Sequence, residues 1–249
     1  MTNWGRDVYP NTSSDFPSDE AGTSLPELIV AMAVGFVILT AAVELLSSLQ
    51  HRFTNQQVSL AQQQDVRLSL ELLSEELHLA APDSLFVMKQ DEVEFEANIN
   101  GIFSTVSAPV LLGQTEIKVL DGRDWPERKI ILICWNDRCE TMTLARDGQR
   151  SVLTVTQPVL TAIPSGAFVT IRNRVRYYTR RDENGSLRLL RQVDGGASVL
   201  VGDIQEMRLS YWNGQGRQET QAPFVRRIVV ELTLAGRSTR AVREISLRD

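Results

Sequence analysis

The sequence is poor in the residues that most often build metal sites and covalent frameworks. Its 249 residues include two cysteines, Cys134 and Cys139, and two histidines, His51 and His78. Two cysteines are too few for a disulfide-dense scaffold or an iron–sulfur protein. A zinc site is also excluded, because four ligands are not available near either cysteine. We therefore expect no metal and no cofactor.

Motifs for catalysis are equally scarce. His51 and His78 lie in a helical pattern, distant in sequence from any serine or cysteine in an elbow motif. No set of nucleophile, base and orienting residue is visible. Gly195-Gly196 and Gly214-Gln215-Gly216 are typical of turns and do not form a phosphate-binding loop. We predict that the protein is not an enzyme and takes no small-molecule substrate.

Positive charge is in deficit, because 26 Lys and Arg stand against 31 Asp and Glu, a formal net charge of −5. One segment that alternates as a strand is the exception: it carries Arg172, Arg174, Arg176 and Arg180, with Tyr178 among them. Such a face could follow phosphates and stack a base. Arginines on a solvated strand face are the alternative, and the net charge gives no support to nucleic acid as a partner.

A long hydrophobic run lies near the N-terminus. Residues 28–43 contain no charge, and the run extends from Leu25 if Glu27 and Glu44 are accepted near its ends. About 20 such residues span a bilayer. A secretory signal peptide would have a basic flank and a small-residue cleavage site after the run, and neither is present. We expect a retained single-pass transmembrane segment at about residues 25–46.

The residues on either side of this run differ sharply. Residues 1–22 are polar and without periodicity, which predicts a disordered leader. After the run, the apolar residues keep a helical spacing as far as Ala81-Pro82-Asp83, a helix stop. The predicted helix covers residues 23–82 and is about 80–85 Å long. Its apolar stripe beyond the span consists of Leu45, Leu46, Leu49, Phe53, Val58, Leu60, Val66, Leu70, Leu73 and Leu77.

From Ser84 onward the hydrophobic period becomes two, which is typical of strands. The predicted strands are 93–97, 129–135, 152–156, 168–181, 187–192, 204–212, 225–234 and 240–247. Turn signals separate them, among them Asn136-Asp137 and the hairpin dipeptide Asn184-Gly185. We expect an α+β protein in which the long helix packs on an antiparallel β-sheet head made of residues 83–249.

The segment Gly22-Thr23-Ser24-Leu25-Pro26-Glu27 resembles the processing site of type IV prepilins and type II secretion pseudopilins. The resemblance implies that a prepilin peptidase cuts between Gly22 and Thr23 and that the new N-terminus, Thr23, is methylated. It also implies that Glu27, the fifth mature residue, pairs with the free α-amine of an adjacent subunit during assembly.

Two features depart from that family's pattern. The first mature residue is threonine where phenylalanine is usual, and Asp19 and Glu20 precede the glycine where Lys or Arg is usual. Glu27 has a structural alternative as well. Ser24 and Glu27 are spaced as a capping box, and Pro26 suits the first turn of a helix.

Two further regions are similar to W-type minor pilins and J-type pseudopilins. These regions are the amphipathic segment 66–77 and the C-terminal strand series 203–212 and 222–232. The resemblance implies a minor subunit that takes part in the initiation or the tip of a type IV pilus or a pseudopilus. It would sit in the inner membrane with its head in the periplasm, and its partners would be other pilins. The alternative is an anchored envelope binding module or adhesin that does not polymerise.

Cys134 and Cys139 flank Trp135-Asn136-Asp137-Arg138 in a hairpin pattern, in which a polar turn follows an apolar strand. Cysteines on either side of such a loop can face each other at about 5.5 Å between Cα atoms, which suits a disulfide. An oxidising periplasm would support the bond. Two free, buried thiols are the alternative.

Overall fold

The computed structural model of the chain describes residues 25–236 and 240–248. The predicted leader, including Gly22, and also Thr23 and Ser24, lie outside the described residues. The chain falls into two units that meet between Gln57 and Val58. Each unit is described below by itself.

The first element is the helix α1, Leu25–His78, which has 54 residues. Pro26 lies in its first turn, where a missing N–H is tolerated. At the other end the Leu79 and Ala80 N–H groups donate to the carbonyls of Glu76 and Leu77, each three residues back. Pro82 disfavours a helical backbone at the residue before it. The helix therefore ends before residue 82, and a short 3₁₀ helix, η1 (Pro82–Ser84), follows.

The two units contain different parts of this helix. Every side chain from Leu25 to Gln57 is exposed. In the second unit Val66, Leu70, Leu73 and Leu77 are buried. These four residues recur at helical spacing, so one face of this part of α1 packs into the head.

The head is an antiparallel sheet. Among the described residues ten strands form it, and seven of them follow the order β1-β2-β8-β9-β10-β11-β12. These are β1 (Leu85–Met88), β2 (Glu92–Ala97), β8 (Phe168–Arg181), β9 (Leu187–Val193), β10 (Gly196–Asn213), β11 (Val225–Leu234) and β12 (Arg240–Ser246). A 3₁₀ turn, η2 (Ala222–Phe224), precedes β11.

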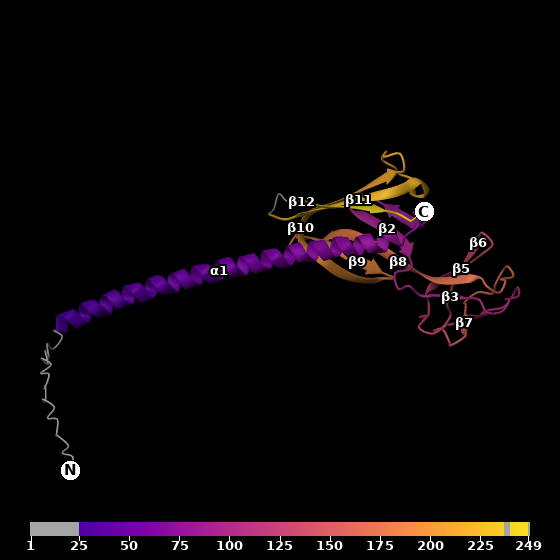
Figure 1. Cartoon of the computed structure of the whole chain (residues 1–249), viewed down its shortest axis with the longest axis horizontal. Coiled ribbons are helices and arrows are strands. Elements are labelled where there is room, and N and C mark those ends of the chain that lie inside the picture. Colours follow the sequence, from indigo (N-terminus) through magenta and orange to yellow (C-terminus); the bar gives the residue numbers. More distant parts are fainter. Residues whose placement is uncertain (1–24, 237–239, 249) are drawn as a thin grey trace, which may run out of the picture. The chain divides into compact units, whose positions relative to one another are not determined.

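The other strands gather in a lobe beside the first half of β8 (Figure 1). There β3 (Phe103–Thr105) and β5 (Ile130–Trp135) pair with β8, and β6 (Arg138–Thr143) pairs with β5. A separate pair is formed by β4 (Glu116–Lys118) and β7 (Val152–Thr154).

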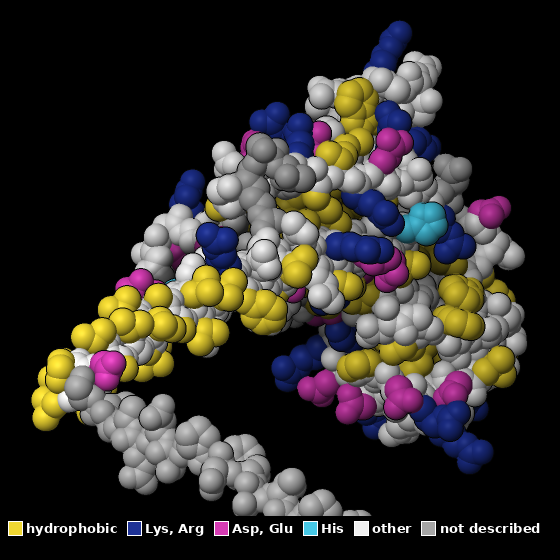
Figure 2. Space-filling model, turned by 60° about the vertical axis from the view of Figure 1, so that its left-hand side comes forward, with side chains coloured by type: hydrophobic (Ala, Val, Ile, Leu, Met, Phe, Trp, Pro, Cys, Tyr) yellow, Lys and Arg dark blue, Asp and Glu magenta, His cyan; other side chains and the backbone are white. Residues whose placement is uncertain are grey.

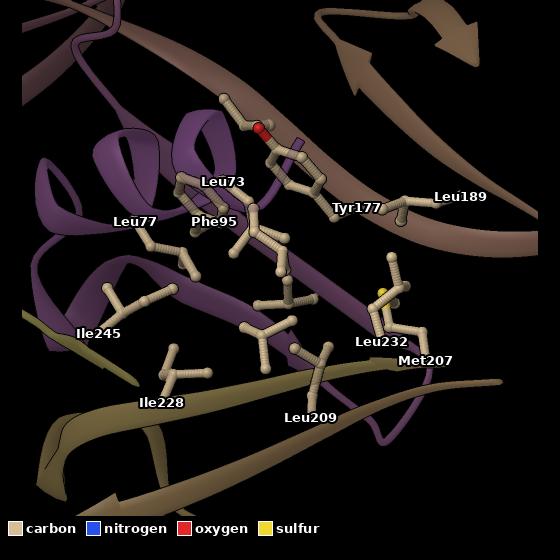
Figure 3. Packing of buried hydrophobic residues seen from close by; sticks show 14 of the residues in the cluster. Leu73, Leu77, Phe95, Tyr177, Leu189, Met207, Leu209, Ile228, Leu232 and Ile245 are labelled. Carbon is tan, nitrogen blue, oxygen red and sulfur yellow. The ribbon is translucent and has the colours of Figure 1, made fainter. Parts of the chain in front are cut away.

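Strand β8 links two hydrophobic cores. Its residues 168–172 pair with β3 and β5, and residues 173–181 pair with β2 and β9. Val169 and Ile171 belong to the core of the lobe, whereas Val175 and Tyr177 belong to the core under α1. Figure 3 shows this second core, in which Leu73 and Leu77 meet Phe95 and Ile228.

The α+β prediction is confirmed at the level of a long apolar N-terminal helix and an antiparallel sheet. The eight predicted strand segments all contain strand residues. The short strands β1, β3 and β4 and residues 196–203 of β10 were not predicted. Asp194 and Gly195 have φ of 49° and 99°, so the turn there is tight and β10 begins at Gly196. Gly196 and Gly202 interrupt the alternation of apolar and polar residues in 196–203, so the sequence pattern does not indicate a strand there.

Candidate functional site

The exposed part of α1 is the first candidate site. Among the described residues α1 is the one helix that is long and apolar enough to cross a membrane. Its residues 25–46 are about 33 Å long, close to the thickness of a bilayer's hydrocarbon core. Figure 2 shows hydrophobic side chains covering the visible face of this part of the helix. Exposed apolar surface on this scale is typical of contact with lipid or with other proteins.

Glu27 lies in the first turn of this helix. It lines a shallow concave surface together with Pro26, Val30, Ala31, Val34, Gly35 and Ile38. These residues recur three and four positions apart, so they share one helix face. A Cβ built on Gly35 would have no atom within 4 Å, so this face is open around it. The predicted assembly residue thus belongs to an apolar face with small residues at its centre.

The sequence predicts no catalytic residues and no metal ligands, and both stay predictions. His51 lies in the exposed part of α1, and the His78 Nδ1 atom is 3.0 Å from the Ser246 carbonyl oxygen. Within residues 25–236 and 240–248 no group of three or more His, Cys, Asp or Glu is placed to hold a metal ion.

A buried ion pair fastens α1 to the sheet. Glu76 is 5% exposed, although it carries a carboxylate. The Arg191 Nε group of β9 donates to Glu76 Oε2 at 2.9 Å, and Arg191 Nη2 donates to Oε1. The Tyr177 hydroxyl of β8 donates to the same carboxylate. The pair is bidentate, a geometry that helps to offset the desolvation of both charges.

These contacts shift two pKa values in the same direction. Burial, and then the adjacent Glu76 carboxylate, raise the pKa of Tyr177. The hydrogen bonds with Glu76 raise the pKa of Arg191. Both shifts favour a protonated Tyr177, which donates to Glu76, and a charged Arg191. None of these three residues is a predicted site residue. The sequence did contain a signal for this buried pair. Glu76 is a charged residue that falls on the otherwise apolar stripe of the helix, between Leu73 and Leu77.

The arginine face of β8 lies against a row of glutamates on β2. Arg172 is 3.6 Å from Glu96, and Arg176 is 2.7 Å from Glu92. Arg174 pairs with Glu94. Arg180 lies beyond the residues of β8 that pair with β2. The Arg176 guanidinium also lies 4.5 Å from the centroid of the Tyr178 ring.

Glu92 forms ion pairs with two cations, Lys89 and Arg176. Its hydrogen bond with Lys89 is the main cause of its lowered pKa, and Arg176 acts in the same direction. Three arginines of the β8 face are thus matched by carboxylates, which leaves little net positive charge along it. Phosphate binding depends on such charge. That protein surface fits the alternative of a solvated strand face, and the expectation of no nucleic-acid contact stays a prediction.

A second acid, Asp194, lies at the junction of the two cores, and its side chain is 26% exposed. It follows β9 and accepts hydrogen bonds from the Arg174 N–H and from the Asn173 Nδ2 group, both at 2.9 Å. Lys129, just before β5, also donates to it. Burial raises the pKa of Asp194, but the hydrogen bonds from Lys129, Asn173 and Arg174 outweigh burial and lower it.

The two cysteines are directly opposite each other in the β5–β6 hairpin and form a disulfide with an S–S distance of 2.08 Å. The turn between the strands is shorter than the expected loop. Asn136 and Asp137 have φ of 45° and 60°, which suits a two-residue hairpin. The Cα atoms are 4.1 Å apart, nearer than the expected 5.5 Å, as in the close pairs of an antiparallel ladder.

Comparison of the chain with protein-family models, with curated proteins and with solved structures finds no match.

Replacing Arg191 with leucine should lower the free energy of unfolding by about 3–5 kcal/mol, because Glu76 would remain buried without its cation. The double variant Glu76→Leu with Arg191→Leu should recover part of that loss. Denaturant unfolding of the full chain in detergent measures both. Arg208→Leu is the matched control. Arg208 and its partner Glu206 have side chains 50% and 52% exposed, so losing this pair should leave the free energy of unfolding nearly unchanged. Equal losses in the two single variants would contradict the role of the buried pair.

The stabilisation from Asp194 should depend on pH in a defined direction. A lowered folded-state pKa stabilises the protein above the unfolded pKa of about 3.9, and this stabilisation disappears as the pH falls through the folded value. Asp194→Asn should therefore lower the melting temperature at pH 7, and the difference from wild type should shrink below about pH 4. Thermal scans from pH 2 to pH 7 test this. Asp65→Asn, at an exposed position of α1, should show no such trend.

Proposed function

We propose that the protein is a minor subunit of a type IV pilus or of a type II secretion pseudopilus, anchored by α1 and docked to its neighbours through Glu27. A prepilin peptidase would cut between Gly22 and Thr23 and methylate Thr23. The subunit would then sit in the inner membrane with its head in the periplasm and take part in the initiation or the tip of the filament.

The observation that carries this proposal is the helix face around Glu27. A carboxylate at the edge of a membrane span is costly and is usually there for a function. Ala31 and Gly35 on the same face allow another helix to come close. In the low dielectric of the bilayer, a cation such as the Thr23 amine of the next subunit would be attracted strongly to Glu27. This face therefore suits helix–helix docking with one charged pair that sets the register.

The head supports the same proposal in a different way. The apolar stripe of α1 divides into an exposed part up to Gln57 and a buried part from Val66 to Leu77. A pilin-like architecture needs both parts on one helix, the first for lipid and neighbours and the second for its own sheet. The charge-free segment 28–43 lies wholly within the exposed part.

A second candidate is an anchored envelope binding module that never polymerises. The acidic residues Asp19 and Glu20 favour it, because a prepilin leader usually carries basic residues there. In that case α1 would be a simple anchor, and Glu27 would only cap the helix with Ser24.

The mature N-terminus separates the two candidates. The filament proposal expects a chain that begins with N-methylated Thr23, as measured by mass spectrometry of protein purified from its native membranes. The same strain without its prepilin peptidase should yield the full-length chain. Recovery of an intact N-terminus in the presence of the peptidase would contradict the filament proposal and support the second candidate.

Replacing Glu27 with glutamine removes the charge while nearly preserving the shape of the side chain. We expect the variant to enter filaments at least about tenfold less than wild type, because one charged pair in low dielectric is lost. Immunoblots of sheared filaments measure incorporation, and a melting curve checks that the head is folded. Glu44→Gln, at the other end of the uncharged run, is the control and should assemble normally. Equal incorporation of both variants would rule out docking through Glu27.

A further inference from the structure

The sheet of the head ends at β12. In the part of the chain that the structure describes, β12 pairs with β11 alone. The Leu247 N–H donates to the Arg226 carbonyl at 2.9 Å, which identifies that facing pair as a hydrogen-bonded one. Hydrogen-bonded pairs alternate along an antiparallel ladder. The pairs at Ile245, Arg243 and Ala241 are therefore also bonded to β11.

The intervening residues of β12 direct their N–H and C=O groups away from β11. The Ser246 carbonyl has this direction, and it lies 3.0 Å from the His78 Nδ1 atom. The backbone N–H and C=O groups of Arg240, Val242 and Glu244 also point away from β11. The outer edge of β12 thus offers a row of backbone donors and acceptors, which is a template for another strand.

An apolar groove of about 510 Å³ lies beside this edge, within the head unit. Its inner surface is formed by Val66 and Leu70 of α1 and by Leu232 and Leu234 of β11, all of which are buried. Val242 on its rim is 55% exposed. An extended chain added to β12 could place alternate side chains over this groove, because successive side chains of a strand point to opposite faces.

Among the described residues, two cations and one acid line the groove. Arg67, Glu71 and Arg243 line it, and none of the three makes a hydrogen bond or ion pair with a described residue. The neighbouring charges differ in this respect, because Arg240 pairs with Glu231 and Glu244 pairs with Arg227. Two free guanidinium groups against one carboxylate favour an acidic occupant.

We propose that the β12 edge and this groove bind an extended, acidic segment of a partner protein by strand addition. The backbone of the segment pairs with Arg240, Val242 and Glu244. Every second side chain of the segment faces the groove, and this face carries both apolar side chains that cover Val66 and Leu70 and carboxylates that meet Arg67 and Arg243. Backbone pairing supplies affinity and the side chains supply selectivity.

Charge argues against a second copy of this chain as the occupant. Antiparallel pairing of two β12 strands keeps their side chains on the same face, so a second Arg243 would approach a groove that already has an excess of cations. The proposal does not rest on the assembly role of Glu27, since every residue of this surface lies in the second unit, which begins at Val58, and would serve a filament partner or any other envelope protein.

The test uses the full-length chain in detergent micelles and a fluorescein-labelled peptide of Val-Thr-Glu-Thr repeats, in which one face of the strand carries both valine and glutamate. Fluorescence anisotropy should show saturable binding that weakens with salt, because the charged contacts are solvent-accessible. The matched peptide with lysine in place of glutamate should bind at least about tenfold more weakly, a difference of about 1.4 kcal/mol. A peptide with N-methylated backbone should not bind.

Val242→Pro removes one outward N–H group without breaking a bond to β11, and proline is tolerated at such edge positions. This variant should keep its melting temperature and bind the acidic peptide at least about tenfold more weakly, through loss of a backbone pair. Val242→Thr keeps the N–H and should bind as wild type does. Reversing charge with Arg67→Glu and Arg243→Glu should transfer the preference to the lysine peptide.

Three results would overturn the proposal. The acidic peptide could fail to bind, or it could bind folded Val242→Pro as tightly as wild type. The chain could also elute as a dimer that Val242→Pro converts to a monomer, in which case a second copy covers the edge. None of these results bears on the mass of the mature N-terminus or on Glu27, so the proposed function is tested separately.

Discussion

The bidentate pair between Glu76 and Arg191 is the constraint on which the head depends. It fixes both the rotation and the axial position of α1, because a shift by one residue would turn the carboxylate by about 100° around the helix axis, away from its cation. The Tyr177 hydroxyl, held protonated by burial, uses the remaining acceptor capacity of Glu76. The apolar contacts of Leu73 and Leu77 supply much of the attraction between α1 and the sheet, and the Glu76 ion pair makes the packing specific.

The two cores of the head are connected by β8 and by Asp194. Strand β8 changes partners between Arg172 and Asn173, so one continuous backbone belongs to both cores. Asp194 reinforces the junction, since its carboxylate accepts from Lys129 near β5 and from Arg174 on β8. The lobe is therefore attached by covalent, hydrogen-bonded and ionic links at one place. This arrangement allows the lobe to differ in sequence without altering the packing of α1.

Local patterns predicted much of the fold. The alternation in 168–181 and the Asn184-Gly185 turn placed β8 and β9, since both signals depend on neighbouring residues. Pairings between distant segments were not predictable. Glu76 and Arg191 are 115 residues apart, and nothing local in the sequence links them. The same holds for the glutamates of β2, which turn the arginine face of β8 into a row of ion pairs. Gly22 and Thr23 lie outside the described residues, so the processing prediction still rests on the sequence.

The continuity of α1 has a mechanical consequence. Because α1 is one continuous helix from Leu25 to His78, a tensile load on its first turns is transmitted through its backbone to the part of the helix that packs on the sheet. The load would act in shear on Val66, Leu70, Leu73 and Leu77, whose contacts lie side by side along the helix. Contacts loaded in shear must give way together, whereas contacts peeled from one end break in sequence. The Glu76–Arg191 bridge, near the far end of α1, would be strained with them and would resist extraction of the helix from its sheet.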